Sequence, residues 1–207
     1  MGRITVGPDS AGADPGPACY GKGGAIPAVT DANFLLGRYD GSRFAGGTMR
    51  LDEEAARDAV NIQVGMKLGL APEMAALGVI EMVDENMANA ARVHAIESGK
   101  SYDGRTMIAF GGGGPVHGFR VAEKIGIGRV LVPSGAGVGS AIGFLRAPVA
   151  YEITKSAVIS LEDFNAERVN KLLTSMTADA RAVVATALGK TKPTLHVIAD
   201  CRYVGQG

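Results

Sequence analysis

The feature that most constrains the fold of this chain is a run of four glycines, FGGGGPVH at residues 110–117. An apolar segment typical of a strand, Thr106–Phe110, precedes it, and a segment typical of a helix, Val116–Ile125, follows it. A backbone without Cβ atoms lets a ligand approach closely, and a helix N-terminus directs free N–H groups and partial positive charge at that ligand. This arrangement suits a nucleotide, although neither a Rossmann fingerprint nor a P-loop is present.

The segments around the glycines predict a βαβ unit. Glycines at 126 and 128 allow a turn, and a second strand is expected at Arg129–Val132. Strands joined by a crossover helix are parallel, so both carboxyl ends lie at one edge of the sheet. The second strand leads into another glycine-rich segment, Ser134–Ser140, which opens a short helix to about Leu145. The two glycine loops are therefore expected to be neighbours.

The remaining elements follow from caps and periodicity. One helix is expected from the N-cap Asp52 to Gly69, and a long one from about Pro72 to Ser98. The apolar stripe of the long helix is predicted at Leu77, Ile80, Val83, Met87 and Ala91. Later, an extended stretch at 149–160, a helix capped by a box at 160–163, and an alternating strand at 194–204 are expected. These patterns indicate three regions: a Gly/Pro-rich loop region 1–50, a helical and βαβ segment 51–148, and an incomplete region 149–207. A strand at a chain end suggests a fragment of a larger protein.

Charge and composition exclude several functions. Lysine plus arginine and aspartate plus glutamate both number 21, so no basic field favours nucleic acid or a membrane surface. The sequence carries no signal peptide or membrane-length apolar run, which makes the cytoplasm the default location. The histidines and cysteines have no metal-ligand spacing, so no metal ligand is named.

Polar residues near the N-terminus are candidates for catalysis, namely Asp14 and Asp31. Each has a structural alternative: Asp14 precedes Pro15 and could shape a turn, and Asp31 could cap a short helix 32–36. Cys19 lacks a nearby histidine and has little support as a nucleophile. His117, in the first turn after the glycines, could contact a ligand or could pack at the helix start.

Five stretches together resemble the hydantoinase A/5-oxoprolinase family. They are residues 6–21 (VGPDSAGADPGPACYG), 29–37 (VTDANFLLG), 109–117 (AFGGGGPVH), 129–133 with 137–141 (RVLVP and GVGSA), and 202–206 (RYVGQ). The resemblance covers most of the chain. It implies an α/β fold that is part of an actin-like ATPase lobe, as in sugar kinases and Hsp70.

The resemblance also implies a cofactor and a reaction. Gly111, Gly112, Gly113 and Gly114 match the family's adenosine motif, so these glycines with Pro115 and His117 are the expected cofactor-binding residues. ATP with Mg²⁺, a small cyclic amide substrate, an oligomeric assembly and a partner subunit of the hydantoinase B type are implied. The family's D-x-G-G-T phosphate loops are missing, so the chain is expected to be an inactive half-site by itself. A non-catalytic scaffold subunit, a subunit of an ATP-dependent ketone carboxylase and a sugar-kinase-like relative remain alternatives.

Overall fold

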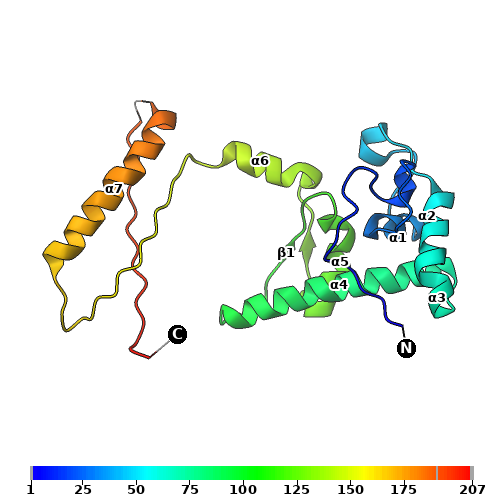
Figure 1. Cartoon of the computed structure of the whole chain (residues 1–207), viewed down its shortest axis with the longest axis horizontal. Coiled ribbons are helices and arrows are strands. Elements are labelled where there is room, and N and C mark those ends of the chain that lie inside the picture. Colours follow the sequence, from blue (N-terminus) through cyan, green and yellow to red (C-terminus); the bar gives the residue numbers. More distant parts are fainter. Residues whose placement is uncertain (1, 190, 206–207) are drawn as a thin grey trace. The chain divides into compact units, whose positions relative to one another are not determined.

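The computed structural model describes residues 2–189 and 191–205. The chain divides into two compact units, residues 1–142 and 143–207, and Figure 1 labels the helices α1 to α7 and strand β1. No helix among the described residues is both long and apolar enough to span a bilayer.

The first unit is built around a long central helix, α4 (Pro72–Glu97), as its periodicity and Pro72 predict. Helix α1 (Val29–Leu35) packs against it and also contacts α2 (Glu53–Val60). The core between them consists mainly of small residues: Ala32, Val60, Ala75, Ala76 and Ile80 are all fully buried. Small side chains let these helices approach closely, so this core holds few bulky groups.

The apolar stripe predicted for the long helix is confirmed at Ile80 and wrong at Leu77 and Met87, because the buried face is rotated about the helix axis. The buried face of α4 consists of Ala75, Ala76, Ile80, Asp84 and Ala88, whereas Leu77 and Met87 are partly exposed. Residues 76, 80, 84 and 88 recur every four positions, as the face of a helix requires. The positions of the large apolar side chains indicated the wrong face of the helix. The buried face is formed mostly by alanine and includes a carboxylate, so it lacks a strong apolar pattern.

The helix predicted from Asp52 has the expected beginning and end but an irregular middle. The Asp52 side chain accepts a hydrogen bond from the Ala55 N–H (3.0 Å), and Gly69 ends the segment with a φ of 69°. Between α2 and the short α3 (Met66–Leu68) the chain forms a π-helical turn, Asn61–Gly65. Gly65 is buried there, and a Cβ on it would lie 2.8 Å from the Leu70 carbonyl oxygen.

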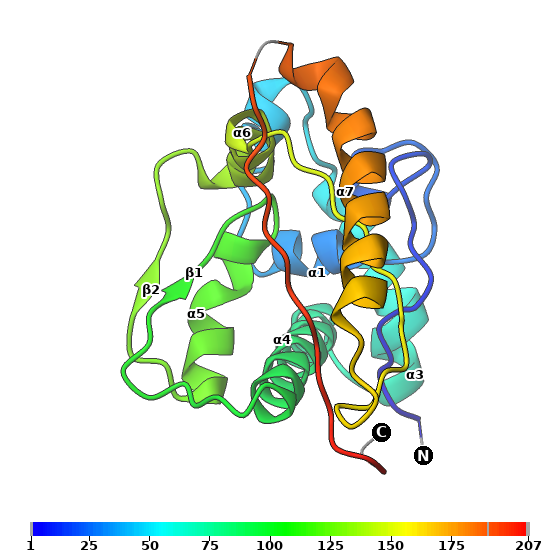
Figure 2. The same cartoon turned by 90° about the vertical axis from the view of Figure 1, so that its left-hand side faces the viewer.

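The βαβ unit is confirmed. Strands β1 (Met107–Ile108) and β2 (Val130–Leu131) pair in parallel, with Met107 opposite Val130. Helix α5 (Gly114–Ile125) joins them, contacts both strands and packs against α4 (Figure 2). Gly118 permits this packing, because a Cβ there would lie 2.9 Å from the Ala109 Cβ. The strands are shorter than predicted, and the unit otherwise matches the expected order and direction.

Three short 3-10 turns complete the first compact unit of the chain: Ala18–Tyr20, Phe44–Gly47 and Ala136–Val138. The first of them belongs to a second small core, in which Cys19, Leu51 and Ala56 are buried under Tyr20, Phe34, Tyr39 and Phe44. Helix α6 (Gly139–Arg146) follows the last turn and crosses the boundary between the units.

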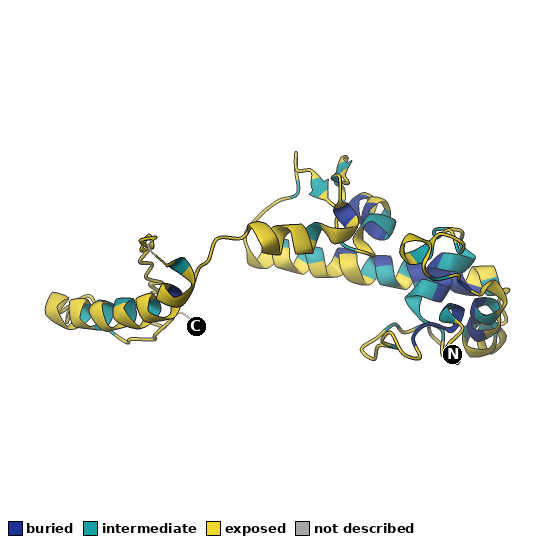
Figure 3. Cartoon of the chain, turned by 90° about the horizontal axis from the view of Figure 1, so that it is seen from above, coloured by how far each residue is buried: buried dark blue, intermediate teal, exposed yellow. Residues whose placement is uncertain are grey.

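The second unit contains helix α7 (Ala166–Leu188) flanked by extended chain. The predicted capping box at 160–163 is wrong, because α7 begins later, with Asn165 accepting from the Arg168 N–H (2.9 Å). Ser160 instead closes its own turn, accepting from the Glu162 N–H (3.2 Å). Residues 149–160 and 194–204 are extended but form no strand pairs within the described chain. Val184 is the one buried residue among those described in this unit. Figure 3 accordingly draws nearly all of this unit in the colours of exposed and intermediate residues.

Candidate functional site

Asp31 organises the Gly/Pro-rich loop. It lies inside α1 at the third position, so the alternative that it caps a helix beginning at residue 32 is wrong. Its carboxylate is fully buried and accepts three backbone hydrogen bonds: from Cys19 (2.7 Å), Ala28 (2.7 Å) and Ala18 (3.2 Å). Buried N–H groups require acceptors, so this one carboxylate fixes both the start of α1, at Ala28, and the loop segment at residues 18–19.

Cys19 lies beside that carboxylate and is completely buried. Burial, followed by the hydrogen bond and charge of Asp31, raises the pKa of the Cys19 thiol far above its usual value. Because the thiolate is the nucleophilic form, this environment gives an unreactive packing residue. Asp14, by contrast, is exposed on the outer part of the same loop, and its catalytic role stays a prediction.

The glycine loop is open. A Cβ added at Gly111, Gly112, Gly113 or Gly114 would meet no atom within 4 Å. Gly111 has a φ of 90°, which requires glycine, while Gly112 to Gly114 have ordinary φ values. Packing inside this chain therefore explains none of the last three glycines. Free space in front of them is what a ligand-facing loop needs.

The two glycine loops are neighbours, as predicted. The Gly111 N–H donates to the Ala136 carbonyl (2.7 Å), and a Cβ on Gly139 would lie 3.2 Å from the Phe110 side chain. Helix α5 starts at the first loop, with Gly113 as its N-cap and Pro115 in its first turn, and no side chain caps it. The helix N-terminus thus lies beside two glycine-rich backbones with no carboxylate capping it.

His117 faces inward from that first turn. It is buried, and its Nδ1 lies 2.6 Å from Asp84 Oδ1 on α4, while its Nε2 lies 3.1 Å from Asn33 Nδ2 on α1. Both ring nitrogens are engaged, so the side chain has no free nitrogen for a ligand. Of the two alternatives for His117, the geometry favours packing at the helix start.

Sequence reasoning missed Asn33 and Asp84, both of which are buried. Asn33 also accepts from Arg38 Nη1 (3.3 Å). One signal was present, since a carboxylate at position 84 interrupts the buried face that Ile80 and Ala88 define. Asp84 lies 33 residues and Asn33 lies 84 residues before His117 in the sequence, so no local sequence pattern connects them.

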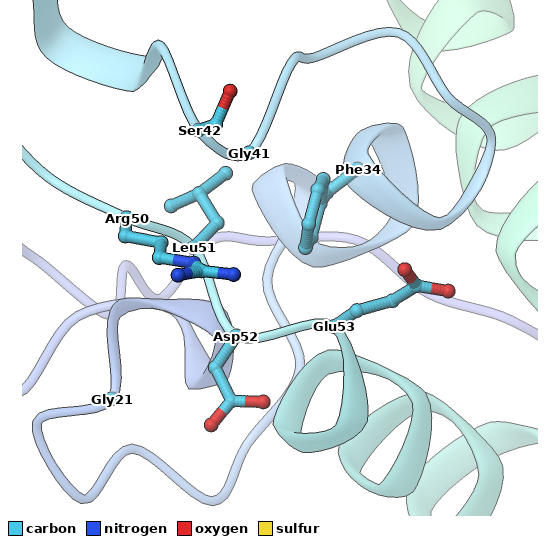
Figure 4. Close-up of a pocket in the computed structure, with 8 residues that line it drawn as sticks. All are labelled: Gly21, Phe34, Gly41, Ser42, Arg50, Leu51, Asp52 and Glu53. Atoms are coloured by element: carbon cyan, nitrogen blue, oxygen red, sulfur yellow. The ribbon is translucent and has the colours of Figure 1, made fainter. Parts of the chain in front are cut away.

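A pocket of about 660 Å³ lies in the first unit, next to Gly21 (Figure 4). It is lined by Gly21, Phe34, Gly41, Ser42, Arg50, Leu51, Asp52 and Glu53. The guanidinium of Arg50 and the carboxylates of Asp52 and Glu53 give it charges of both signs. Among the described residues, no group of three or more His, Cys, Asp or Glu side chains could hold a metal ion.

These features define a mixed α/β protein with an open glycine loop at the strand edge of a βαβ unit. Residues 1–153 match the Hydantoinase/oxoprolinase family. The chain belongs to this family, as the five stretches of its sequence indicate.

Two curated relatives and one solved structure show how far the similarity extends. An uncharacterized protein of Methanocaldococcus jannaschii is 37% identical over 98% of this chain and 29% of its own length. The caprolactamase subunit alpha of Pseudomonas jessenii is 40% identical over 84% of this chain and 25% of its own. The nucleotide-free structure of acetone carboxylase, an enzyme of ATP-dependent acetone carboxylation, superimposes with a TM-score of 0.67 at 30% identity over 89% of this chain and 26% of that one. The chain thus spans between a quarter and a third of the length of these relatives.

Proposed function

We propose that this chain is a segment of an ATP-dependent cyclic-amide hydrolase of the hydantoinase/5-oxoprolinase type, and that it contributes the adenosine side of the ATP site. The observation that carries the proposal is the free space in front of Gly111–Gly114, together with the uncapped N-terminus of α5. Membership of the family and the ATP dependence of the structurally similar acetone carboxylase support the choice of nucleotide.

The loop would serve the nucleotide through its backbone. Adenine and ribose need a flat, close approach, which glycines 111–114 leave open, and Pro115 fixes the chain as it enters the helix. His117 would act from behind the loop, because its ring is turned into the protein. In the actin-like ATPase lobe that we propose, loops outside this chain would hold the phosphates. The isolated 207 residues would then be half of a site without turnover of their own.

ATP would supply a phosphoryl group that converts an amide oxygen into a better leaving group. This chain's contribution would be binding and orientation. Asp31 would keep the loop at residues 18–19 in place, and Asp14, exposed on that loop, would be the carboxylate available to a substrate. The described residues offer no ligand set for Mg²⁺, so no step is assigned to it. A cytoplasmic oligomer containing a hydantoinase B-type subunit completes the proposal.

ATP binding to the complete protein tests the adenosine assignment. Gly112→Asp places a carboxylate where the nucleotide should approach, and we expect calorimetry to show at least about tenfold weaker binding. Gly128→Asp is the matched control, because Gly128 also has open space around it but lies in the turn before β2, at the other end of the sheet. Unchanged affinity in Gly112→Asp would remove the assignment.

A ketone carboxylase is the second candidate, since the acetone carboxylase structure superimposes over most of the chain. ATP turnover by the complete protein separates the two reactions. A hydrolase consumes ATP with a cyclic amide alone, whereas a carboxylase requires a ketone and bicarbonate together.

A further inference from the structure

Four side chains form a one-directional chain of hydrogen bonds behind the glycine loop. Arg38 Nη1 lies 3.3 Å from Asn33 Oδ1, Asn33 Nδ2 lies 3.1 Å from His117 Nε2, and His117 Nδ1 lies 2.6 Å from Asp84 Oδ1. We name this set the Arg38–Asp84 relay. Its members come from α1 and the chain just after it, from the first turn of α5 and from the middle of α4.

The direction of the relay follows from what each group can donate. A guanidinium only donates, so the atom of Asn33 that faces Arg38 must be its oxygen. The amide nitrogen of Asn33 then faces His117 and donates, which makes Nε2 the acceptor. Nδ1 consequently carries the ring proton and donates it to Asp84. Arg38 thereby fixes the tautomer of a histidine two residues beyond Pro115.

The relay contributes little stability compared with apolar side chains of the same volume. Asp84 is completely buried, and its second oxygen, Oδ2, has no hydrogen-bond partner among the described residues. A buried carboxylate with an unpaired oxygen carries a desolvation cost, and apolar replacement of a whole buried network is often neutral or stabilising, whereas removal of a single member is destabilising. Surface ion pairs of Glu81 and Glu85 with Arg120 and Lys124 also join α5 to α4, and each contributes little to stability. Apolar side chains could join the two helices equally well, so the buried polar members of the relay need a further explanation.

Position supplies that explanation. Asn33 is two residues from Asp31, whose carboxylate holds the loop at residues 18–19. His117 is three residues from Gly114, where the open glycines end. Helix α1 is thus pinned by one side chain to the Gly/Pro-rich loop and by another to the start of α5.

We propose that Asp84 and Asn33 are positioning residues, which act through His117 to set the glycine loop against the loop that Asp31 holds. The inference rests on the proposed function, because the loop that is positioned is the proposed adenosine loop. Asp84 and Asn33 touch no ligand in this account. Loss of one member of the relay lowers the stability of the fold and lets the glycine loop move.

The test uses the complete protein with two readouts, hydrogen exchange of peptides covering residues 109–118 without nucleotide, and ATP affinity by calorimetry. Asp84→Leu removes the acceptor of His117, and we expect faster exchange in these peptides and at least about tenfold weaker ATP binding. Asp84→Asn keeps an oxygen for Nδ1–H and should restore affinity to within about threefold. Glu85→Gln is the matched control, since Glu85 is the next residue on α4 and contacts Lys124 of α5 on the surface; both readouts should stay near the native values.

The outcomes separate the relay from the proposed function. Native exchange at 109–118 in a folded Asp84→Leu protein overturns the relay whatever ATP does. Faster exchange with native ATP affinity, while Gly112→Asp weakens binding, overturns the positioning role. If Gly112→Asp binds ATP normally, the adenosine assignment fails and the relay is judged by exchange alone. Should Asp84→Leu not fold, Asn33→Leu with the same two readouts decides, because it breaks the relay and leaves the Asp84–His117 contact.

Discussion

Two glycine-rich loops of the first unit use glycine for opposite reasons. In the N-terminal loop two of the glycines are required by packing: a Cβ on Gly24 would lie 2.4 Å from the Gly16 carbonyl oxygen, and one on Gly16, whose φ is 75°, would lie 2.8 Å from Tyr20. At Gly111–Gly114 a Cβ would meet no atom of the described residues within 4 Å. The first loop is closed by its own protein and by Asp31, and the second is open. The contrast separates glycines kept for folding from glycines kept for something that approaches from outside.

The largest expected effect is at the centre of the closed loop. Asp31→Ala leaves the N–H groups of Ala18, Cys19 and Ala28 without their acceptor, at about 1–3 kcal/mol for each buried group. We expect a loss of about 4 kcal/mol in the free energy of unfolding, measured by urea denaturation. Asp31→Asn keeps one acceptor oxygen and should lose about half as much. A loss below about 1 kcal/mol in Asp31→Ala would show that the carboxylate does not organise this loop.

The next prediction compares the two loops by the same substitution, glycine to alanine, in each of them. Gly24→Ala forces a Cβ into a backbone oxygen and should cost about 1–3 kcal/mol of stability. Gly112→Ala has open space and no strained φ, so its stability should change by less than about 0.5 kcal/mol. Parallel urea titrations of the two variants measure the difference. Equal destabilisation would mean that the glycine loop is packed as the first loop is.

Local signals account for what the sequence predicted well. Asp52 as a cap, Pro72 and Gly69 at helix ends, and the βαβ unit around the glycines all depend on residues within a few positions of one another. The misplaced start of α7 has the same origin, because both Ser160 and Asn165 are capping residues. Which of the two residues caps α7 depends on how far the helical pattern of apolar residues extends toward the N-terminus.

Of the candidate site, the sequence predicted only the open glycines, which face outward. The open glycines are a contiguous motif, whereas the relay behind them joins residues 33, 84 and 117 through tertiary packing. The rotated face of α4 hid Asp84 as well. Because alanine forms that interface, its buried side carries a weaker hydrophobic signal than its exposed side, where Leu77 and Met87 lie.

The smallest expected effect concerns the surface ion pairs that Glu81 of α4 forms with Arg120 and Lys124 of α5. Hydrogen bonds from Arg120 and then Lys124 lower the pKa of Glu81 to about 2. A carboxylate with a lowered pKa stabilises the fold fully above its unfolded value of 4.5, and this contribution is lost as the pH falls toward 2. Glu81 is partly exposed, so Glu81→Gln should lower Tm by only about 1–2 °C at pH 7. The difference from the native protein should shrink between pH 4.5 and 2 in thermal scans. A gap that stays constant over this range would show that the ion pairs do not contribute.

A structure of the complete protein with a non-hydrolysable ATP analogue tests the central claim most directly. We expect adenine and ribose in van der Waals contact with the backbone of Gly111–Gly114, the His117 ring still turned toward Asp84, and phosphates held by residues outside this chain. Protein atoms from elsewhere filling the space in front of these glycines, with the nucleotide bound at a distance, would contradict it.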